Sequence, residues 1–174
     1  MSILVSTGPG TGGMPRLVTV VVAALAVVAA LVPVTTLTAP PAEAASGARK
    51  VSASFDQQVL HWTNVERKKR GLRALQMREC VKRFAYRHTK RMASRDRLYH
   101  QQLRPVMRKC HASRAAENVA WGSSGMSARS LVKRWMKSPG HRRNILSRQH
   151  GRIGIDAWRS SSTGRVYVAQ VFRG

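Results

Sequence analysis

Three residues of this chain, His100, Glu117 and His141, have side chains that can bind a divalent metal or polarise a small ligand. Imidazole and carboxylate groups both offer lone pairs near neutral pH, and two histidines with one glutamate equal the protein ligand set of some catalytic zinc sites. Such a site keeps one coordination position for water. Two interpretations therefore compete: the three side chains line a ligand or metal site, or they simply satisfy one another's hydrogen bonds beneath a sheet.

Short segments around these residues follow one another in a recognisable order. They are Asn64 to Leu75, His100, Glu117 to Ala120, Trp135 to Leu146, Arg152 to Ile155, and Tyr167 to Phe172. In order and spacing the chain, from near Phe55 to its end, resembles the bacterial branch of the CAP superfamily. That family is named after cysteine-rich secretory proteins, antigen 5 and pathogenesis-related class one proteins. The segments together are specific for the domain and far less specific for a function.

The resemblance implies a central cavity lined by two histidines and two acids. By the motif match, His100 is the first histidine, Glu117 is the acid of the Glu-Asn pair, and His141 is the histidine of the His-x-x-Asn motif. The fourth position, an acid in eukaryotic relatives, aligns with Ser138. Serine carries no charge and does not compete as a metal ligand at neutral pH. No cofactor is required, and we expect zinc or another divalent cation to bind here more weakly than at a full tetrad.

Other polar and aromatic residues of these segments are more easily interpreted as structural. The amides of Asn118 and Asn144 each follow a cavity residue closely, where they can tie a loop backbone by hydrogen bonds. We expect Trp121 and Trp135 to be core or groove-lining aromatics. His88 lies on the apolar face of a predicted helix, and we expect it to be a core histidine hydrogen-bonded to backbone.

The N-terminus is typical of an export signal. An apolar run follows Arg16, prolines end it, and a small-x-small site at Ala42 to Ala44 predicts cleavage after Ala44. Residues 1–44 are therefore predicted to be a signal peptide, with translation starting at Met1 or Met14, and residues 45–53 a linker before a CAP domain at 54–174. The expected location is extracellular. A membrane anchor is the alternative, since about 20 apolar residues span a bilayer.

Both cysteines, Cys80 and Cys110, fall in the predicted exported part, where the redox environment permits a disulfide. We predict that they pair, because closing a loop of that length would stabilise a small domain by about 3 to 4 kcal/mol in the chain-entropy model. Two buried thiols are the alternative, and two lone cysteines make a poor metal site.

The chain is strongly basic, with 31 Lys and Arg residues against seven Asp and Glu and a net charge of +24. Such a field attracts polyanions, so anionic envelope polymers or lipids are the expected partners. The basic residues are scattered along the chain and the aromatics are few, which disfavours sequence-specific nucleic-acid binding. A monomer is expected. An arginine-rich composition can also reflect a GC-rich genome without any anionic partner.

Periodicity predicts an α+β fold, an α-β-α sandwich with a small antiparallel sheet between helical layers, which the resemblance also implies. A capping residue at Ser54 opens a first helix that stops at Gly71. The other expected elements are a helix over 77–95, a loop holding His100 and Pro105, a strand over 116–121, a helix from Ser127 stopped by Ser138-Pro139-Gly140, and a hairpin whose turn is Ser160 to Gly164.

The preferred function is a secreted, non-enzymatic binding module at the cell envelope or in the medium. Family resemblance implies a lipid such as a sterol or fatty acid, another small apolar ligand, or a divalent metal. The alternative is a metal-dependent hydrolase, a peptidase or nuclease, that uses His100, Glu117 and His141. Since no spare acid accompanies these three residues to act as general base, the prediction leans against an enzyme. A cationic antimicrobial protein is a third possibility, resting on charge alone.

Overall fold

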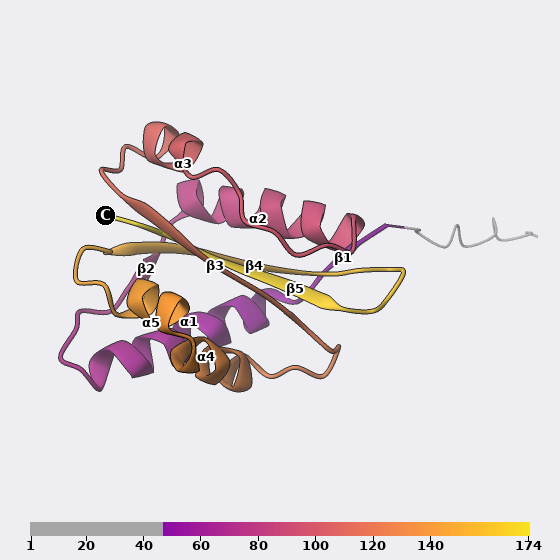
Figure 1. Cartoon of the computed structure of the whole chain (residues 1–174), viewed down its shortest axis with the longest axis horizontal. Coiled ribbons are helices and arrows are strands. Elements are labelled where there is room, and N and C mark those ends of the chain that lie inside the picture. Colours follow the sequence, from indigo (N-terminus) through magenta and orange to yellow (C-terminus); the bar gives the residue numbers. More distant parts are fainter. Residues whose placement is uncertain (1–46) are drawn as a thin grey trace, which may run out of the picture. The chain divides into compact units, whose positions relative to one another are not determined.

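In this computed structural model, which describes residues 47–174, a sheet separates two layers of helices (Figure 1). Four strands are antiparallel neighbours in the order β1 (Arg49–Lys50), β4 (Arg152–Arg159), β5 (Val166–Arg173) and β3 (Ala115–Gly122). The short β2 (Gln76–Met77) also pairs with β4 and is parallel to it. The α+β sandwich with its small antiparallel sheet is thus confirmed, with β2 as a parallel exception.

The described residues begin inside the segment that was expected to be a linker. Arg49 and Lys50 pair with Arg159 and Trp158 of β4, and the Val51 amide donates to the Ala157 carbonyl at 3.0 Å. Ordered structure therefore starts before Ser54. The predicted signal peptide, residues 1–44, lies outside the described residues, as does the alternative start. Within residues 47–174, every helix is too short or too polar to cross a bilayer.

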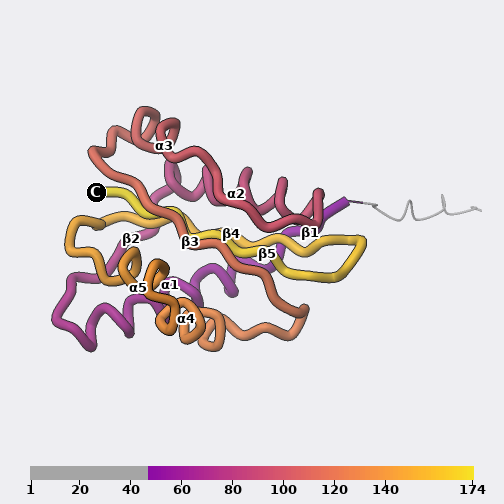
Figure 2. Tube along the Cα trace, viewed as in Figure 1, coloured from indigo at the N-terminus to yellow at the C-terminus, as the bar shows by residue number. Residues whose placement is uncertain are grey.

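One face of the sheet is covered by α2 (Glu79–Ser94), with α3 (Arg104–Lys109) beside it (Figure 2). His88 lies on the apolar face of α2, as expected, and the residues of that face are all buried: Val81, Phe84, Ala85, His88 and Met92. The helix begins at Glu79 rather than Met77, because Met77 pairs with Ile153 in the sheet. α3 was not expected, since Pro105 was placed in a loop; proline is tolerated in a first helical turn, where its missing N–H has no partner to lose.

The height of α2 above the sheet is set at Gly154 of β4. A Cβ atom on this residue would clash with the Lys82 backbone nitrogen and with the Val81 carbonyl group. These atoms belong to the α2 backbone and cannot rotate away. Glycine at this position therefore allows the helix to rest directly on the strand.

The opposite face is covered by α1 (Ala53–Lys68), α4 (Ala128–Lys137) and α5 (Pro139–Leu146). The predicted Ser127 cap of α4 is confirmed, because its Oγ accepts from the Ser130 amide at 3.2 Å. α1 begins slightly earlier than predicted, with Ser52 rather than Ser54 at its N-cap. The Ser138-Pro139-Gly140 stop does end α4, but Pro139 also opens α5, which was not expected.

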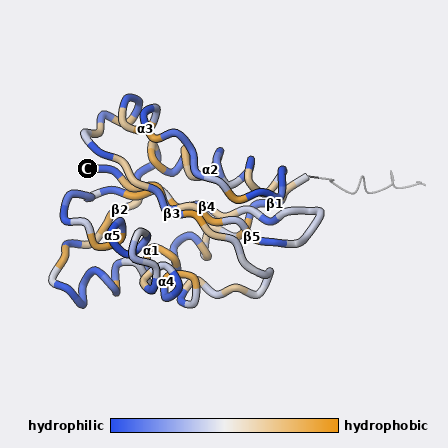
Figure 3. The backbone as a smooth tube through the Cα atoms, viewed as in Figure 1, coloured by the Kyte–Doolittle hydropathy of each residue, from blue (hydrophilic) through white to orange (hydrophobic). Residues whose placement is uncertain are grey.

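Two apolar cores lie on either side of the sheet, and apolar residues recur along the strands between them (Figure 3). Alternate residues of β4 and β5 supply both cores, as the period of two in a strand requires. The core under α1, α4 and α5 contains Val59, Leu131, Trp135, Ile145, Ile155, Val168 and Phe172. The core under α2 and α3 contains Val81, Phe84, Met92, Val106, Val119, Trp158 and Val171.

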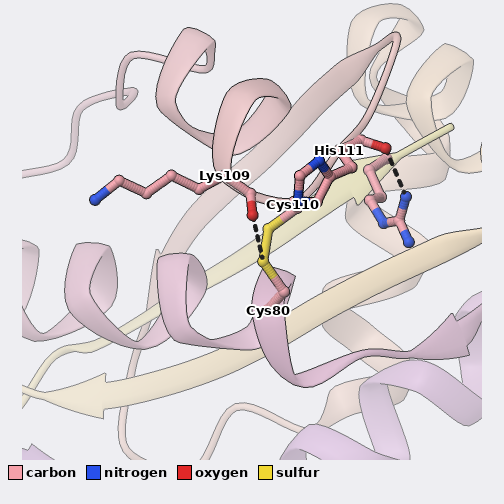
Figure 4. Close-up of a disulfide and its surroundings, with 5 residues drawn as sticks. Cys80, Lys109, Cys110 and His111 are labelled. Carbon is pink, nitrogen blue, oxygen red and sulfur yellow. Dashed lines mark hydrogen bonds between the residues drawn. A yellow bond between two sulfur atoms is a disulfide. The ribbon is translucent and has the colours of Figure 1, made fainter.

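The predicted disulfide is confirmed. Cys80 in the first turn of α2 and Cys110 at the end of α3 are bonded, with their Cα atoms 5.8 Å apart (Figure 4). Cys110 is buried in the core under α2. The bond therefore joins the two ends of the segment that runs from α2 through His100 to α3.

Candidate functional site

The site begins at two consecutive residues of β3, Glu117 and Asn118. Because neighbouring side chains of a strand point to opposite faces, Glu117 faces the α2 layer and Asn118 faces the layer of α1 and α5. Both are buried, and β3 is an edge strand of the sheet. The pair thus links the polar groups of both layers at one edge.

The Glu117 carboxylate is held by the loop that follows α2. His100 Nδ1 lies 2.9 Å from Glu117 Oε2, which also accepts from the Gln101 amide at 3.1 Å. Gln101 Nε2 donates to the other oxygen, Oε1, at 2.7 Å. The Glu117 side chain is 1% exposed, whereas that of His100 is 63% exposed. The acid is therefore a buried anchor, and the histidine is the part of the pair that solvent reaches.

His88 completes the surroundings of Glu117 from α2. Its Nε2 lies 2.8 Å from the Tyr99 carbonyl and 3.8 Å from Glu117 Oε1. Burial lowers the pKa of His88, although the Glu117 charge and the Tyr99 carbonyl oppose that shift. A neutral imidazole that donates to the Tyr99 carbonyl fits these contacts. His88 is thus the backbone-bonded core histidine that was expected, and it positions the loop that carries His100.

His141 approaches the same edge from the first turn of α5. Its ring centroid lies 6.4 Å from that of Trp135, which is buried in the core. Burial lowers the pKa of His141, and the nearby charge of His100 lowers it further. Its Nδ1 is buried without a hydrogen-bond partner among the described residues. Ser138 is half-buried at the junction of α4 and α5.

The structure brings His100 and Glu117 into contact and leaves His141 without a hydrogen bond to either. Within residues 47–174, no three His, Cys, Asp or Glu side chains are placed where they could hold one metal ion together. Both Glu117 oxygens already accept hydrogen bonds. As they lie here, the three residues do not form a metal site, and zinc binding at His100, Glu117 and His141 stays a prediction.

A chain of buried amides and a hydroxyl crosses the other layer. Asn144 Nδ2 donates to the Glu117 carbonyl at 3.1 Å and to Asn118 Oδ1 at 2.9 Å. Asn118 Nδ2 in turn donates to the His141 carbonyl and to Gln170 Oε1, both at 3.2 Å. Gln170 Nε2 donates to Thr63 Oγ1 of α1 at 2.7 Å. These bonds tie α5, β3, β5 and α1 together.

A groove opens beside His100, on the outer surface of α2 and the loop after it. Its volume is about 520 Å³. Phe84, Tyr99 and Pro105 supply apolar surface, and the remaining lining residues are Arg87, Arg91, Arg95, His100, Gln101 and Gln102. The three arginines are spaced four residues apart, so Arg87 and Arg91 lie along one side of α2 and Arg95 follows them at its C-cap.

Trp121 was expected to be a core or groove-lining aromatic. It belongs to neither apolar core and is 44% exposed, near the end of β3. The Arg165 guanidinium lies over its ring at 4.5 Å from the centroid, a favourable cation–π contact. Trp135, in contrast, is buried as expected.

Several residues that build the site were not predicted. Gln101 supplies two of the bonds to Glu117, and Thr63 and Gln170 extend the buried polar chain. Gln170 carried a usable signal, because it interrupts the apolar face of a strand that alternates Val166, Val168 and Phe172. A lone amide among apolar residues on that face requires a buried partner.

The sequence and the fold were compared with those of known proteins. The family model described as the cysteine-rich secretory protein family, CAP, matches residues 60–172. The protein YkwD of Bacillus subtilis (strain 168) is 32% identical over 117 residues, which cover 63% of this chain and 45% of YkwD. The chain therefore spans less than half the length of this relative.

Solved structures share the fold. An outer surface protein from Borrelia burgdorferi aligns with a TM-score of 0.61 at 18% identity, over 73% of this chain and 97% of that protein. An extracellular protein containing a SCP domain from Bacillus anthracis aligns with a TM-score of 0.58 at 22% identity, over 69% of this chain and 40% of that protein. Since the family match also covers well over half of the sequence, the chain belongs to the cysteine-rich secretory protein (CAP) family.

Proposed function

We propose that this CAP domain is an exported binding module that takes up an anionic amphiphile, a small lipid-like molecule with a negatively charged head, in the groove beside His100. The single observation that carries the proposal is the composition of that groove, which combines the apolar surfaces of Phe84 and Tyr99 with the α2 arginines. Its volume, about 520 Å³, is within the usual range for small-molecule sites.

The α2 arginines favour an anionic head group. Arg87, Arg91 and Arg95 are exposed, and no described acidic side chain forms an ion pair with them. Like charges four residues apart on a helix repel one another. A bound carboxylate or phosphate would relieve that repulsion and accept hydrogen bonds from the guanidinium groups. His100 adds a further polar contact, because no described residue hydrogen-bonds its second ring nitrogen.

The aromatic residues favour an apolar tail. The Arg87 guanidinium lies over the Phe84 ring at 4.9 Å, and Arg97 lies over Tyr99 at 5.7 Å. These arginines place charge directly beside apolar surface, as an amphiphile requires. A ligand whose alkyl tail lies along Phe84 and Tyr99 would keep its head group within reach of Arg91 and Arg95.

Binding without turnover is supported by the state of Glu117. Its two oxygens accept hydrogen bonds from His100 and Gln101, which occupy three of the roughly four lone-pair positions of the carboxylate. The acid thus acts as a support for the His100 loop.

Export is supported by the disulfide, since such bonds persist in oxidising compartments and are rare in the cytosol. The Bacillus anthracis neighbour is described as extracellular. A secreted form that begins at Ala45 on N-terminal sequencing would test cleavage. Recovery of the protein with residues 1–44 attached, in the membrane fraction, would favour the anchor alternative.

Ligand binding is tested with oleate, below its micelle concentration, and with oleyl alcohol as its uncharged counterpart. We expect saturable binding of oleate, measured by calorimetry, and at least tenfold weaker binding of the alcohol. The Arg87→Gln/Arg91→Gln double variant should weaken oleate binding about tenfold. The matched control is Arg108→Gln/Arg143→Gln, which removes two exposed arginines outside the groove. Equal weakening in the two double variants, or equal binding of acid and alcohol, would overturn the proposal.

A further inference from the structure

A second basic pocket lies away from the groove, where the loop after α1, the loop after α5 and the ends of β4 and β5 meet. Its volume is about 780 Å³. Among the described residues that line it, five are arginines and none has an acidic side chain. The arginines are Arg67, Arg73, Arg148, Arg152 and Arg173. It shares no lining residue with the groove beside His100.

The floor of this pocket is a buried arginine whose charge is not neutralised. Arg67 is 2% exposed, and its guanidinium donates only to backbone carbonyls, those of Arg73, Ile145, Ser147 and His150. Carbonyl groups satisfy its hydrogen bonds without supplying a negative charge. Burial lowers the pKa of Arg67, and the charge of Arg73 lowers it further. These four bonds also hold the α1 and α5 loops in fixed positions around the pocket.

His150 is a further buried polar group in the lining. It is stacked on Phe172 with ring centroids 5.5 Å apart, and its Nδ1 has no hydrogen-bond partner among the described residues. Burial lowers the pKa of His150, and the charges of Arg67 and Arg114 add to that effect. The imidazole therefore experiences the positive charge of these arginines, and no described Asp or Glu side chain lines the pocket beside it.

The arginines at the rim of the pocket also lack acidic side chains as partners among the described residues. Arg152 and Arg173 are Cα partners across β4 and β5, and like charges directly opposite in a sheet are unfavourable. Each donates one Nη1 bond to a backbone carbonyl, and the Arg173 Nε is buried without a partner among the described residues. Arg73 and Arg148 are exposed, and their side chains make no described hydrogen bond or ion pair. No described Asp or Glu side chain lines the pocket to balance these positive charges.

We infer that this pocket binds a soluble ligand that carries at least two phosphate groups. Guanidinium groups pair with phosphate oxygens in a bidentate manner, which makes arginine the residue that phosphate recognition favours. A single small anion would fill little of about 780 Å³ and would leave part of the arginine cluster unpaired. Two or more linked phosphates can contact Arg73 and Arg148 on the rim together with Arg152 and Arg173.

The probe is tripolyphosphate, with orthophosphate as the single-phosphate comparison, titrated calorimetrically in about 0.15 M salt to screen the general surface field. We expect saturable binding of tripolyphosphate, at least tenfold tighter than orthophosphate. The Arg73→Gln/Arg148→Gln variant should weaken it about tenfold, because both side chains are on the rim and neither supports the fold. The Arg108→Gln/Arg143→Gln variant loses the same charge elsewhere and should weaken it by less than about twofold.

A chemical readout separates the pocket from general attraction to a basic surface. Tripolyphosphate should protect Arg73 and Arg148 from phenylglyoxal, measured by mass spectrometry of peptides, while Arg108 and Arg143 remain reactive. The inference is wrong if both double variants weaken binding equally, if protection is the same at all four arginines, or if tripolyphosphate does not saturate. Binding to phosphatidylglycerol vesicles without binding to tripolyphosphate would also overturn it, in favour of a membrane surface.

Discussion

Asn144 Nδ2 donates to the backbone carbonyl of Glu117 at 3.1 Å, so the helix that carries His141 is fastened to the strand residue whose side chain holds His100. The same amide donates to Asn118 Oδ1. One side chain therefore connects the two halves of the candidate site through the backbone rather than through a shared ligand.

Asn144→Ala removes both bonds and leaves the Asn118 oxygen without this donor. We expect the free energy of unfolding to fall by about 1 to 3 kcal/mol, the usual effect of leaving a buried polar group unpaired. Urea denaturation measures it. Gln57→Ala, an exposed amide of α1, is the control and should change stability by less than about 0.5 kcal/mol. Similar losses in the two variants would mean that the buried network contributes nothing special.

Glu117→Gln replaces a carboxylate that accepts three hydrogen bonds with an amide that has a single acceptor oxygen. We expect a loss of about 2 kcal/mol and faster amide hydrogen exchange at residues 99–101. Glu79→Gln, at an exposed acid in the first turn of α2, is the matched control. Unchanged exchange at residues 99–101 would show that Glu117 does not hold this loop.

Replacing both bonded cysteines, Cys80→Ser with Cys110→Ser, opens a crosslink that spans 30 residues. We expect stability to fall by about 3 to 4 kcal/mol in the chain-entropy model. Denaturation of the oxidised wild type, the reduced wild type and the variant measures this. Reduced wild type and variant should agree. A variant as stable as the oxidised protein would show that packing around α3 alone fixes this segment.

Asp56 is expected to make the stability of the folded protein depend on pH, and a single variant can separate its contribution from that of other groups. It is buried beside Asp156, and a single lysine, Lys50, pairs with both acids at 2.9 and 2.8 Å. Burial raises the pKa of Asp56 to about 6, while the Lys50 hydrogen bond opposes that shift. Burial likewise raises the pKa of Asp156. Two buried carboxylates thus share one cation.

An acid whose pKa is higher in the folded than in the unfolded protein adds stability at low pH that is lost as pH rises through the folded value. We therefore expect the wild type to gain stability relative to Asp56→Asn between pH 7 and pH 5, by about 1 to 2 kcal/mol. Thermal melts of both proteins across this range measure the difference, which cancels the opposite contribution of the buried histidines common to both. A difference that does not change with pH would place the Asp56 pKa outside this window.

Zinc binding is tested at the position where the family motif has an acid. Ser138→Glu adds a carboxylate at the junction of α4 and α5, three residues before His141, and should tighten zinc binding if the loop of His100 can approach. Zinc titration of wild type, Ser138→Glu, His100→Ala and His141→Ala measures this. His61→Ala, an exposed histidine of α1, is the control. If only the His61→Ala control lost zinc binding, the metal would be bound at the exposed surface of α1 rather than at His100 and His141.

Elements with strong periodicity were predictable, because their burial is recorded in the spacing of apolar residues. The stripe of α4 and the alternation of β4 and β5 are examples. The short helices α3 and α5 were missed since Pro105 and Pro139 act as breakers inside a helix but are tolerated at its start. The contact between His100 and Glu117 followed from a family motif, and no local pattern predicts it.

The partners of Glu117 illustrate what local sequence does not contain. His88 was correctly placed in the core, yet its approach to Glu117 depends on how α2 lies over β3. Gln101 is a polar loop residue like its neighbour Gln102, and only the fold distinguishes the two. Trp121 was expected to be a core or groove-lining aromatic, but it lies near the end of an edge strand, where the Arg165 guanidinium lies over its ring.

Gly154 leaves no room for any side chain between β4 and α2. Even alanine at this position would push the helix outward, and the displacement would pass along α2 to the loop that carries Tyr99 and His100. The spacing of the groove beside His100 therefore depends on one missing methyl group outside its lining. Variants selected for tighter ligand binding in this groove should therefore keep Gly154 and differ at the groove arginines instead.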